Sequence, residues 1–202
     1  MRNSGKIGKP CFPDKRPIYY YITDRKRLAR LSVLECIRRN IERGVDFVQI
    51  REKDLSDRAL FELACRAVAL ARRRGCRILI NGRADIALAC GAAGVHLPST
   101  GLRVEDLLNS LPPRLIVGVS VHSRREALRA AEAGADYVLL GPVFYTESKA
   151  EFGLPLGLNK LRQICSAVRF PVLGLGGMSE EKTSLVLDAG AAGIAGVTMF
   201  QQ

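Results

Sequence analysis

The chain has 202 residues, of which 48% are hydrophobic and 25% are charged. This length and composition predict one globular domain and exclude disorder, collagen and coiled coils. Lys and Arg number 31 against 20 Asp and Glu, a formal net charge of +11, so we expect anionic partners.

Neither a signal peptide nor a membrane span is expected. Residues 1–17 are basic and polar without the apolar stretch of a signal peptide, and nowhere do about 18 apolar residues run together. The six cysteines form no C-x-x-C pair, and several lie in apolar runs, where thiols behave as small hydrophobic side chains. We therefore expect a cytoplasmic protein with a basic N-terminal leader over 1–17 and one domain over 18–202.

Strands alternate with helices along the chain. The β-rich run 18–22 is followed by a helix that opens with Ser32 and Glu35 at capping-box spacing. The second helix shows a clear 3.6-residue apolar period. The predicted strands are 18–22, 47–50, 77–81, 94–97, 115–121, 137–141, 171–175 and 193–198. The predicted helices are 32–43, 56–74, 84–90, 104–110, 124–133, 158–168 and 180–189.

This alternation predicts an α/β fold with a parallel sheet, because each helix must carry the chain back over one face. The junctions that begin at Gly91, Gly134 and Gly190 are nearly the same string, a quasi-repeat that favours a closed (βα)8 TIM barrel over a flavodoxin-like open sheet. Only residues 199–202 follow the last strand, so the eighth helix is missing. The leader or a partner subunit is expected to cover that side, unless the chain was cut.

The second strand predicts a polar lining for the mouth of the barrel. Alternate residues of a barrel strand face inward, and active sites lie at the carboxyl ends of the strands. Because Val48 and Ile50 share the outer face, Gln49, Arg51 and Lys53 are expected to point inward. The alternative is a salt-bridged barrel layer that uses neighbouring carboxylates of the same segment, Glu52 or Asp54.

Two histidines are candidates for proton transfer. On the fifth strand the inner line contains Gly118, Ser120 and His122, and His122 stands at the carboxyl end. The alternative is a capping histidine beside the helix start at Ser123. His96 lies one step deeper on its strand and fits a packed interior histidine as well as a functional one.

Glycine-rich ends of the last two strands predict a phosphate site. The N–H groups of Gly176, Gly177, Val197 and Thr198 are expected to bind the phosphate, as in other barrels of this type, although a Gly-Gly pair also fits a plain turn.

These segments resemble thiamine phosphate synthase, from about residue 18 to 200. The matching strings are Gln49-Ile50-Arg51-Glu52-Lys53, Asn81, Gly94-Val95-His96-Leu97, Gly141-Pro142-Val143-Phe144, Thr146-Glu147-Ser148-Lys149 and Gly174-Leu175-Gly176-Gly177-Met178. The resemblance implies a (βα)8 barrel that joins a pyrimidine pyrophosphate to a thiazole phosphate with Mg²⁺. The expected substrate-binding residues are Gln49, Arg51, Lys53, Asn81, His96, Ser120, Thr146 and Lys149.

Two positions depart from the synthase pattern. Gly82 and Gly101 stand where that family carries the two carboxylates that bind the metal. Mg²⁺ normally takes one or two carboxylates beside substrate phosphates. Asp85 and Asp106 lie inside the following predicted helices and are poor substitutes. We therefore expect no metal and no cofactor, with Mg²⁺ required only by a divergent synthase.

The departures resemble the thiazole tautomerase (TenI) branch of the family, in Asn81-Gly82-Arg83, Leu97-Pro98-Ser99 and Ser120-Val121-His122-Ser123. The resemblance implies metal-free aromatisation of a carboxythiazole phosphate with His122 as the catalytic residue. Arg51, Lys53 or Lys149 would hold the substrate carboxylate.

The alternatives are a divergent thiamine phosphate synthase and a non-catalytic paralogue that binds a phosphorylated ligand or acts as a regulator. The expected partner is a small phosphorylated thiazole, with a second copy of the chain as a homodimer. We expect neither nucleic acid nor membrane as a partner, because basic runs without interleaved aromatics are typical of solvated helix faces.

Overall fold

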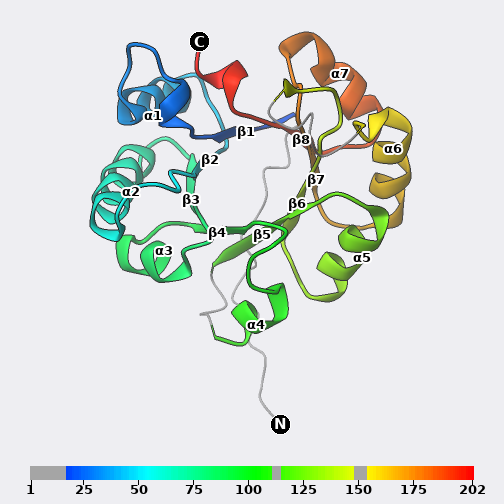
Figure 1. The fold of residues 1–202 in the computed structure, drawn as a ribbon, viewed down its shortest axis with the longest axis horizontal. Helices are drawn as coiled ribbons and strands as arrows, with labels where there is room; N and C mark the ends of the chain where they lie inside the picture. The colour runs from blue at the N-terminus through cyan, green and yellow to red at the C-terminus, as the bar shows by residue number, and fades with distance from the viewer. Residues whose placement is uncertain (1–16, 111–114, 148–153) are drawn as a thin grey trace.

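Eight parallel strands close into a barrel in the computed structural model, which describes residues 17–110, 115–147 and 154–202. β1 pairs with β2 and also with β8, which closes the ring seen in Figure 1 and confirms the TIM barrel over the open sheet. The strands are β1 (Ile18–Ile22), β2 (Phe47–Ile50), β3 (Arg77–Asn81), β4 (Gly94–Leu97), β5 (Ile116–Val121), β6 (Tyr137–Leu140), β7 (Val172–Leu175) and β8 (Gly193–Gly196).

Helices surround the barrel, each between two successive strands (Figure 1). Hydroxyl caps explain several of the starts, because the side chains of Ser32, Ser56 and Ser123 each accept an N–H of the first helical turn. The helices are α1 (Val33–Glu42), α2 (Asp57–Ala71), α3 (Ala84–Cys90), α4 (Val104–Leu108), α5 (Arg124–Glu132), α6 (Gly157–Ala167) and α7 (Glu180–Asp188), with 3-10 turns η1 (Arg25–Arg27) and η3 (Thr198–Phe200).

The alternation of side chains along β2 and β5 is as predicted. Val48 and Ile50 pack with apolar residues of α1 and α2, outside the barrel. Inside the barrel, Tyr20, Phe47 and Tyr137 lie in one apolar cluster. Gly118 leaves room for this cluster, because a Cβ there would stand 2.0 Å from the Cζ atom of Tyr137.

The turn η3 occupies the position after β8 where an eighth helix would stand. The eighth strand ends at Gly196, so its predicted extension to residue 198 is wrong, because Val197 (ψ −72°) leaves the extended conformation. Phe200 is buried against Tyr21, with ring centroids 5.7 Å apart, and Asn40 Nδ2 donates to the Phe200 carbonyl at 2.7 Å. The turn therefore covers β1 and α1. Residues 1–16 of the predicted leader lie outside the described residues.

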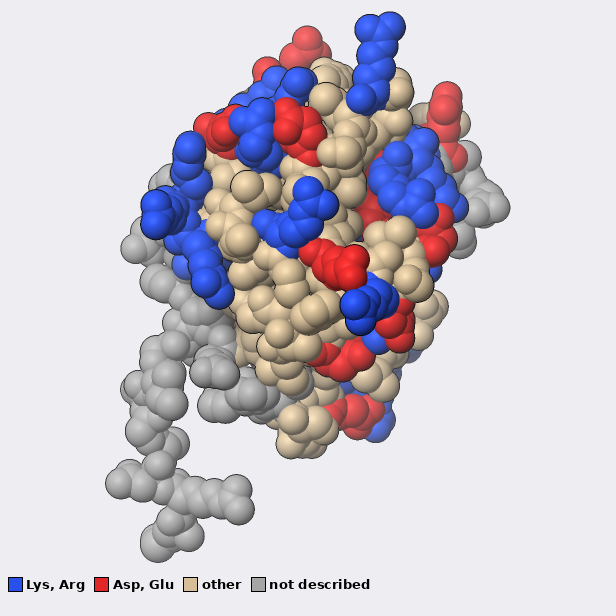
Figure 2. Space-filling view, turned by 90° about the vertical axis from the view of Figure 1, so that its left-hand side faces the viewer, with Lys and Arg blue, Asp and Glu red and all other residues tan. Residues whose placement is uncertain are grey.

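Ion pairs cover the face made by α1, α2 and α3. Figure 2 shows Lys and Arg interspersed with Asp and Glu over this side. Arg38 contacts both Glu35 and Glu42, and Arg58 contacts Glu62. Among the helices in the described ranges, none combines the length and the apolar character that a membrane crossing needs.

Candidate active site at the barrel mouth

Arg51 follows β2 at the mouth and is half-buried. The neighbouring carboxylates are bound by η1 instead: both Glu52 oxygens accept the Arg25 N–H at 3.1 Å, and Asp54 contacts Arg25 and Lys26 at 2.7 and 3.1 Å. Within the described ranges no ion pair includes Arg51. The alternative of Arg51 salt-bridged to Glu52 or Asp54 is therefore wrong, and its guanidinium is available to an anionic ligand.

His96 is buried beneath the mouth, with 1% of its surface exposed. Its Nδ1 lies 2.9 Å from the Tyr137 hydroxyl and its Nε2 lies 2.9 Å from Ser120 Oγ. Burial, with a further contribution from the charge of Arg51, lowers the pKa of His96 to about 3. The histidine is therefore neutral at physiological pH with both nitrogens occupied, which favours the packed alternative over a role in proton transfer.

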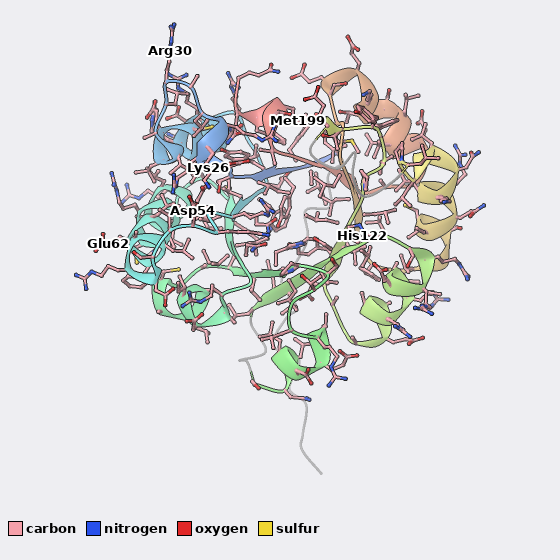
Figure 3. The ribbon with its side chains drawn as sticks, viewed as in Figure 1. Lys26, Arg30, Asp54, Glu62, His122 and Met199 are labelled. Atoms are coloured by element: carbon pink, nitrogen blue, oxygen red, sulfur yellow. The ribbon has the colours of Figure 1, made fainter. Side chains whose placement is uncertain are left out.

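His122 stands one residue beyond β5 and is exposed at the mouth, across the barrel from Lys26 and Asp54 (Figure 3). Its Nδ1 lies 2.5 Å from the Gly141 carbonyl oxygen. Because a carbonyl only accepts, Nδ1 donates its proton to Gly141, and in the neutral form of the ring this leaves the lone pair on Nε2.

The backbone of His122 also takes part in the start of α5. Its N–H donates to Glu126 Oε2 at 2.7 Å, while the Glu126 N–H donates to Ser123 Oγ at 3.2 Å. This is an extended capping box, as the capping alternative predicts, but it uses the backbone of His122, and within the described ranges Nε2 of the imidazole ring has no hydrogen-bond partner.

The loop between β7 and α7 has the backbone that a phosphate site needs. Gly176 and Gly177 have φ of +94° and +63°, in the left-handed region that favours glycine. Within the described ranges their N–H groups donate no loop or turn hydrogen bond. Val197 and Thr198 lie after the neighbouring strand β8, so the predicted phosphate site draws on two adjacent strand ends.

A cavity of about 300 Å³ lies at the ends of β2 and β3 beside the start of α2. Lys53, Asn81, Gly82 and Arg83 are among its lining residues, so two predicted substrate-binding residues share one hollow. Of the other predicted binding residues, Thr146 is half-buried after β6, and Lys149 lies outside the described residues.

The residues at the ends of β3 and β4 do not fit a two-carboxylate magnesium site. Gly82 and Gly101 have no side chain there, and the nearby carboxylates of Asp57 and Asp85 both contact the guanidinium of Arg83. In the part of the chain that the structure describes, no group of three or more His, Cys, Asp and Glu side chains could hold a metal ion. Asp106, in α4, likewise forms an ion pair with Arg103, which precedes that helix.

Sequence reasoning missed three features of the mouth. Arg25 of η1 contacts Glu52 and Asp54, which follow β2, and nothing in the local sequence pattern predicts these contacts. Tyr20 lies inside the barrel, as the alternation along β1 could have predicted. Lys182 Nζ lies 2.8 Å from the Gly177 carbonyl oxygen and 4.9 Å from the centroid of the Phe144 ring. Lys182 lies in the first turn of α7, where a positive charge is unfavourable beside the helix dipole. This unusual position was the one sign in the sequence that the lysine has another role.

Comparison with known proteins identifies the family. A protein of Aquifex aeolicus named putative thiamine-phosphate synthase 2 is 42% identical over 184 residues, which cover 91% of this chain and 97% of that protein. The thiamine-phosphate synthase of Roseiflexus castenholzii is 38% identical over 91% of this chain and 81% of its own length.

Among solved structures, thiamine phosphate pyrophosphorylase from Pyrococcus furiosus is 33% identical with a TM-score of 0.82, covering 92% of this chain and 88% of that one. The family model described as thiamine monophosphate synthase matches residues 19–200. On these grounds, and with the same closed barrel, the chain belongs to the thiamine monophosphate synthase family.

Proposed function

We propose that the chain acts in thiamine biosynthesis as a thiazole tautomerase, which aromatises a carboxythiazole phosphate by proton transfer without a metal. The observation that carries this proposal is the pairing at the mouth of glycines at 82 and 101 with an exposed His122. The glycines provide no carboxylates for the metal of the synthase reaction, and the neutral imidazole of His122 offers a lone pair on Nε2.

His122 can move both protons of this isomerisation. Nε2 removes the proton from ring C2, and the electron pair of that C–H bond shifts into the ring as the exocyclic double bond takes up a proton on its outer carbon. That proton returns from the Nε2–H of the imidazolium, so His122 ends neutral. The Gly141 carbonyl accepts the Nδ1–H throughout, which holds the ring in one tautomer.

Anchoring the two anionic groups of the substrate is the role proposed for the cations and glycines. Arg51 suits the substrate carboxylate best, because a guanidinium donates two parallel hydrogen bonds and this one has no ion pair within the described ranges. The phosphate would lie on the N–H groups of Gly176 and Gly177 near Lys182, with those of Val197 and Thr198 beside them. Two anchors hold the ring still over His122.

A second candidate, thiamine phosphate synthase, is favoured by the names of the relatives. The Roseiflexus castenholzii protein and the Pyrococcus furiosus structure are both named for that reaction, and the comparisons support it more directly than the tautomerase. A synthase would have to bind Mg²⁺ through groups other than residues 82 and 101.

One pair of assays separates the candidates. The purified protein is given carboxythiazole phosphate in EDTA, and separately thiazole phosphate with pyrimidine pyrophosphate and Mg²⁺, and both products are followed by mass spectrometry. We expect aromatisation in the first and no thiamine phosphate in the second. Thiamine phosphate formed at a steady catalytic rate would move the assignment to the synthase.

The variant His122→Asn tests the catalytic residue. It should lower the aromatisation rate by about 10²–10⁴-fold, the usual contribution of a positioned general base. Folding and ligand binding should stay nearly intact, because the ring is exposed. His96→Asn is the control, with a smaller expected effect on the rate. Loss of turnover in His96→Asn but not in His122→Asn would place catalysis on β4.

A further inference from the structure

A line of hydrogen-bonded side chains crosses the barrel beneath the mouth. Successive partners lie 2.9, 3.2, 2.8, 2.9 and 2.9 Å apart. The four inner members are each 1% exposed or less, so bulk solvent does not reach their hydrogen bonds. In order, the line consists of Asn81 on β3, Gln49 on β2, Tyr20 on β1, Tyr137 on β6, His96 on β4 and Ser120 on β5.

The direction of donation is set at the β3 end. Gln49 Nε2 donates to Asn81 Oδ1, so the carbonyl oxygen of Gln49 faces Tyr20 and can only accept. Tyr20 uses its single hydroxyl proton in that bond. The 2.8 Å contact between the two tyrosines must then be a donation from Tyr137 to Tyr20.

The same logic continues to β5. Because the hydroxyl proton of Tyr137 points at Tyr20, its oxygen accepts from His96, which therefore carries its proton on Nδ1. The neutral ring then has only a lone pair on Nε2, and Ser120 must donate its hydroxyl proton to it. All five hydrogen bonds run from Ser120 toward Asn81.

We propose that this chain of hydrogen bonds fixes the protons at the mouth, so that Asn81 presents N–H and Ser120 presents only oxygen lone pairs to a ligand. Tyr20 and Tyr137 are the positioning residues, since neither needs to touch the ligand. The mouth would then take a ligand with a hydrogen-bond acceptor over β3 and a donor over β5. This inference goes beyond the proposed function and holds for either candidate reaction.

Burial makes the direction an all-or-none property. Turning one member alone would set two donors or two acceptors face to face where no water can intervene, a costly arrangement in a dry interior. The groups that face His96 are Tyr20, Tyr137 and Ser120, with Arg51 the nearby charge, and burial keeps the imidazole neutral. A neutral ring must choose one tautomer, and that choice reports the direction of the whole chain.

The tautomer of His96 can be measured directly by ¹⁵N NMR of the imidazole nitrogens at pH 7. The protein has two histidines, so the signals that disappear in His122→Asn belong to His122 and those that remain belong to His96. We expect a pyrrole-type shift at Nδ1 and a pyridine-type shift at Nε2 of His96. The opposite pattern would mean that the chain runs the other way and would overturn the proposal.

Tyr20→Phe tests whether the Tyr20 hydroxyl determines the tautomer of His96 through Tyr137. Without the Tyr20 hydroxyl, Tyr137 has no acceptor there and should turn its proton to His96 Nδ1, so that the Nδ1–H form falls from dominant to minor. Tyr21→Phe is the matched control, because the Tyr21 hydroxyl faces outward onto Cys36, and it should leave the tautomer unchanged. An unchanged tautomer in folded Tyr20→Phe would refute the chain, and if that variant fails to fold, the native tautomer alone decides.

Discussion

Replacing Gly177 by alanine should damage the phosphate site more than it damages the fold. Gly177 has a φ of +63°, where an L-residue costs roughly 1–2 kcal/mol. An added Cβ would also stand 2.4 Å from the Tyr145 carbonyl oxygen and 2.9 Å from Phe144 Cβ. The Gly176-Gly177 loop and the loop after β6 would have to move apart by about 1.0 Å to restore ordinary contact, and such overpacking typically costs about 1–3 kcal/mol more.

Gly44→Ala is the matched control. Its φ is +88° and nothing lies within 4 Å of an added Cβ, so it carries the strain without the collision. It joins α1 to β2, at the end of the barrel opposite the mouth. At about 2–4 °C per kcal/mol for a chain of this size, Gly44→Ala should lower the Tm by about 2–8 °C, and Gly177→Ala should lower it further.

Calorimetric titration with thiazole phosphate gives the second measurement. Gly177→Ala should weaken binding at least about tenfold, because the collision with the loop after β6 pushes the Gly176-Gly177 loop aside by up to about 1 Å and misplaces its N–H groups. Gly44→Ala should bind as the native protein does. Native affinity in Gly177→Ala would refute the assignment of this loop to the phosphate, and equal losses of Tm in the two variants would refute the predicted collision.

Two further predictions concern pH and metal. The pKa of His96 is about 3 when folded and near 6.5 when unfolded, so the unfolded chain binds more protons between these values and the free energy of unfolding should fall as pH drops through that window. We would measure the free energy of unfolding in urea at pH 7.5 and 5.5 for the native protein and for His96→Asn. The difference between the two proteins should be about 1 kcal/mol smaller at pH 5.5. A difference that does not change with pH would contradict the buried neutral histidine. Thiazole phosphate binding should be unchanged by EDTA in calorimetry, since no carboxylate stands at residues 82 and 101, and a collapse of binding on chelation would show that a metal takes part.

The local pattern of the chain determined the elements and their faces. β2 and α3 span the predicted residues, because apolar periodicity and glycine junctions are properties of neighbouring residues. Alternation along a strand likewise placed Val48 outward and Gln49 inward before any contact was known. The eight strands and the quasi-repeated glycine junctions predicted the barrel, and the family motifs at the strand ends predicted which residues would bind the substrate.

Only the tertiary structure decided which polar groups meet. Glu52 is bound by Arg25, from another strand end, and not by adjacent Arg51. Tyr20 and Tyr137 share a hydrogen bond although 117 positions separate them. Such pairings depend on barrel closure, which brings distant strands to a few ångströms, and on burial, which forces each polar group to find a partner there. Neither barrel closure nor burial can be recognised from the residues next to each group in the sequence, so the proposed proton positions at the mouth depend on the tertiary structure.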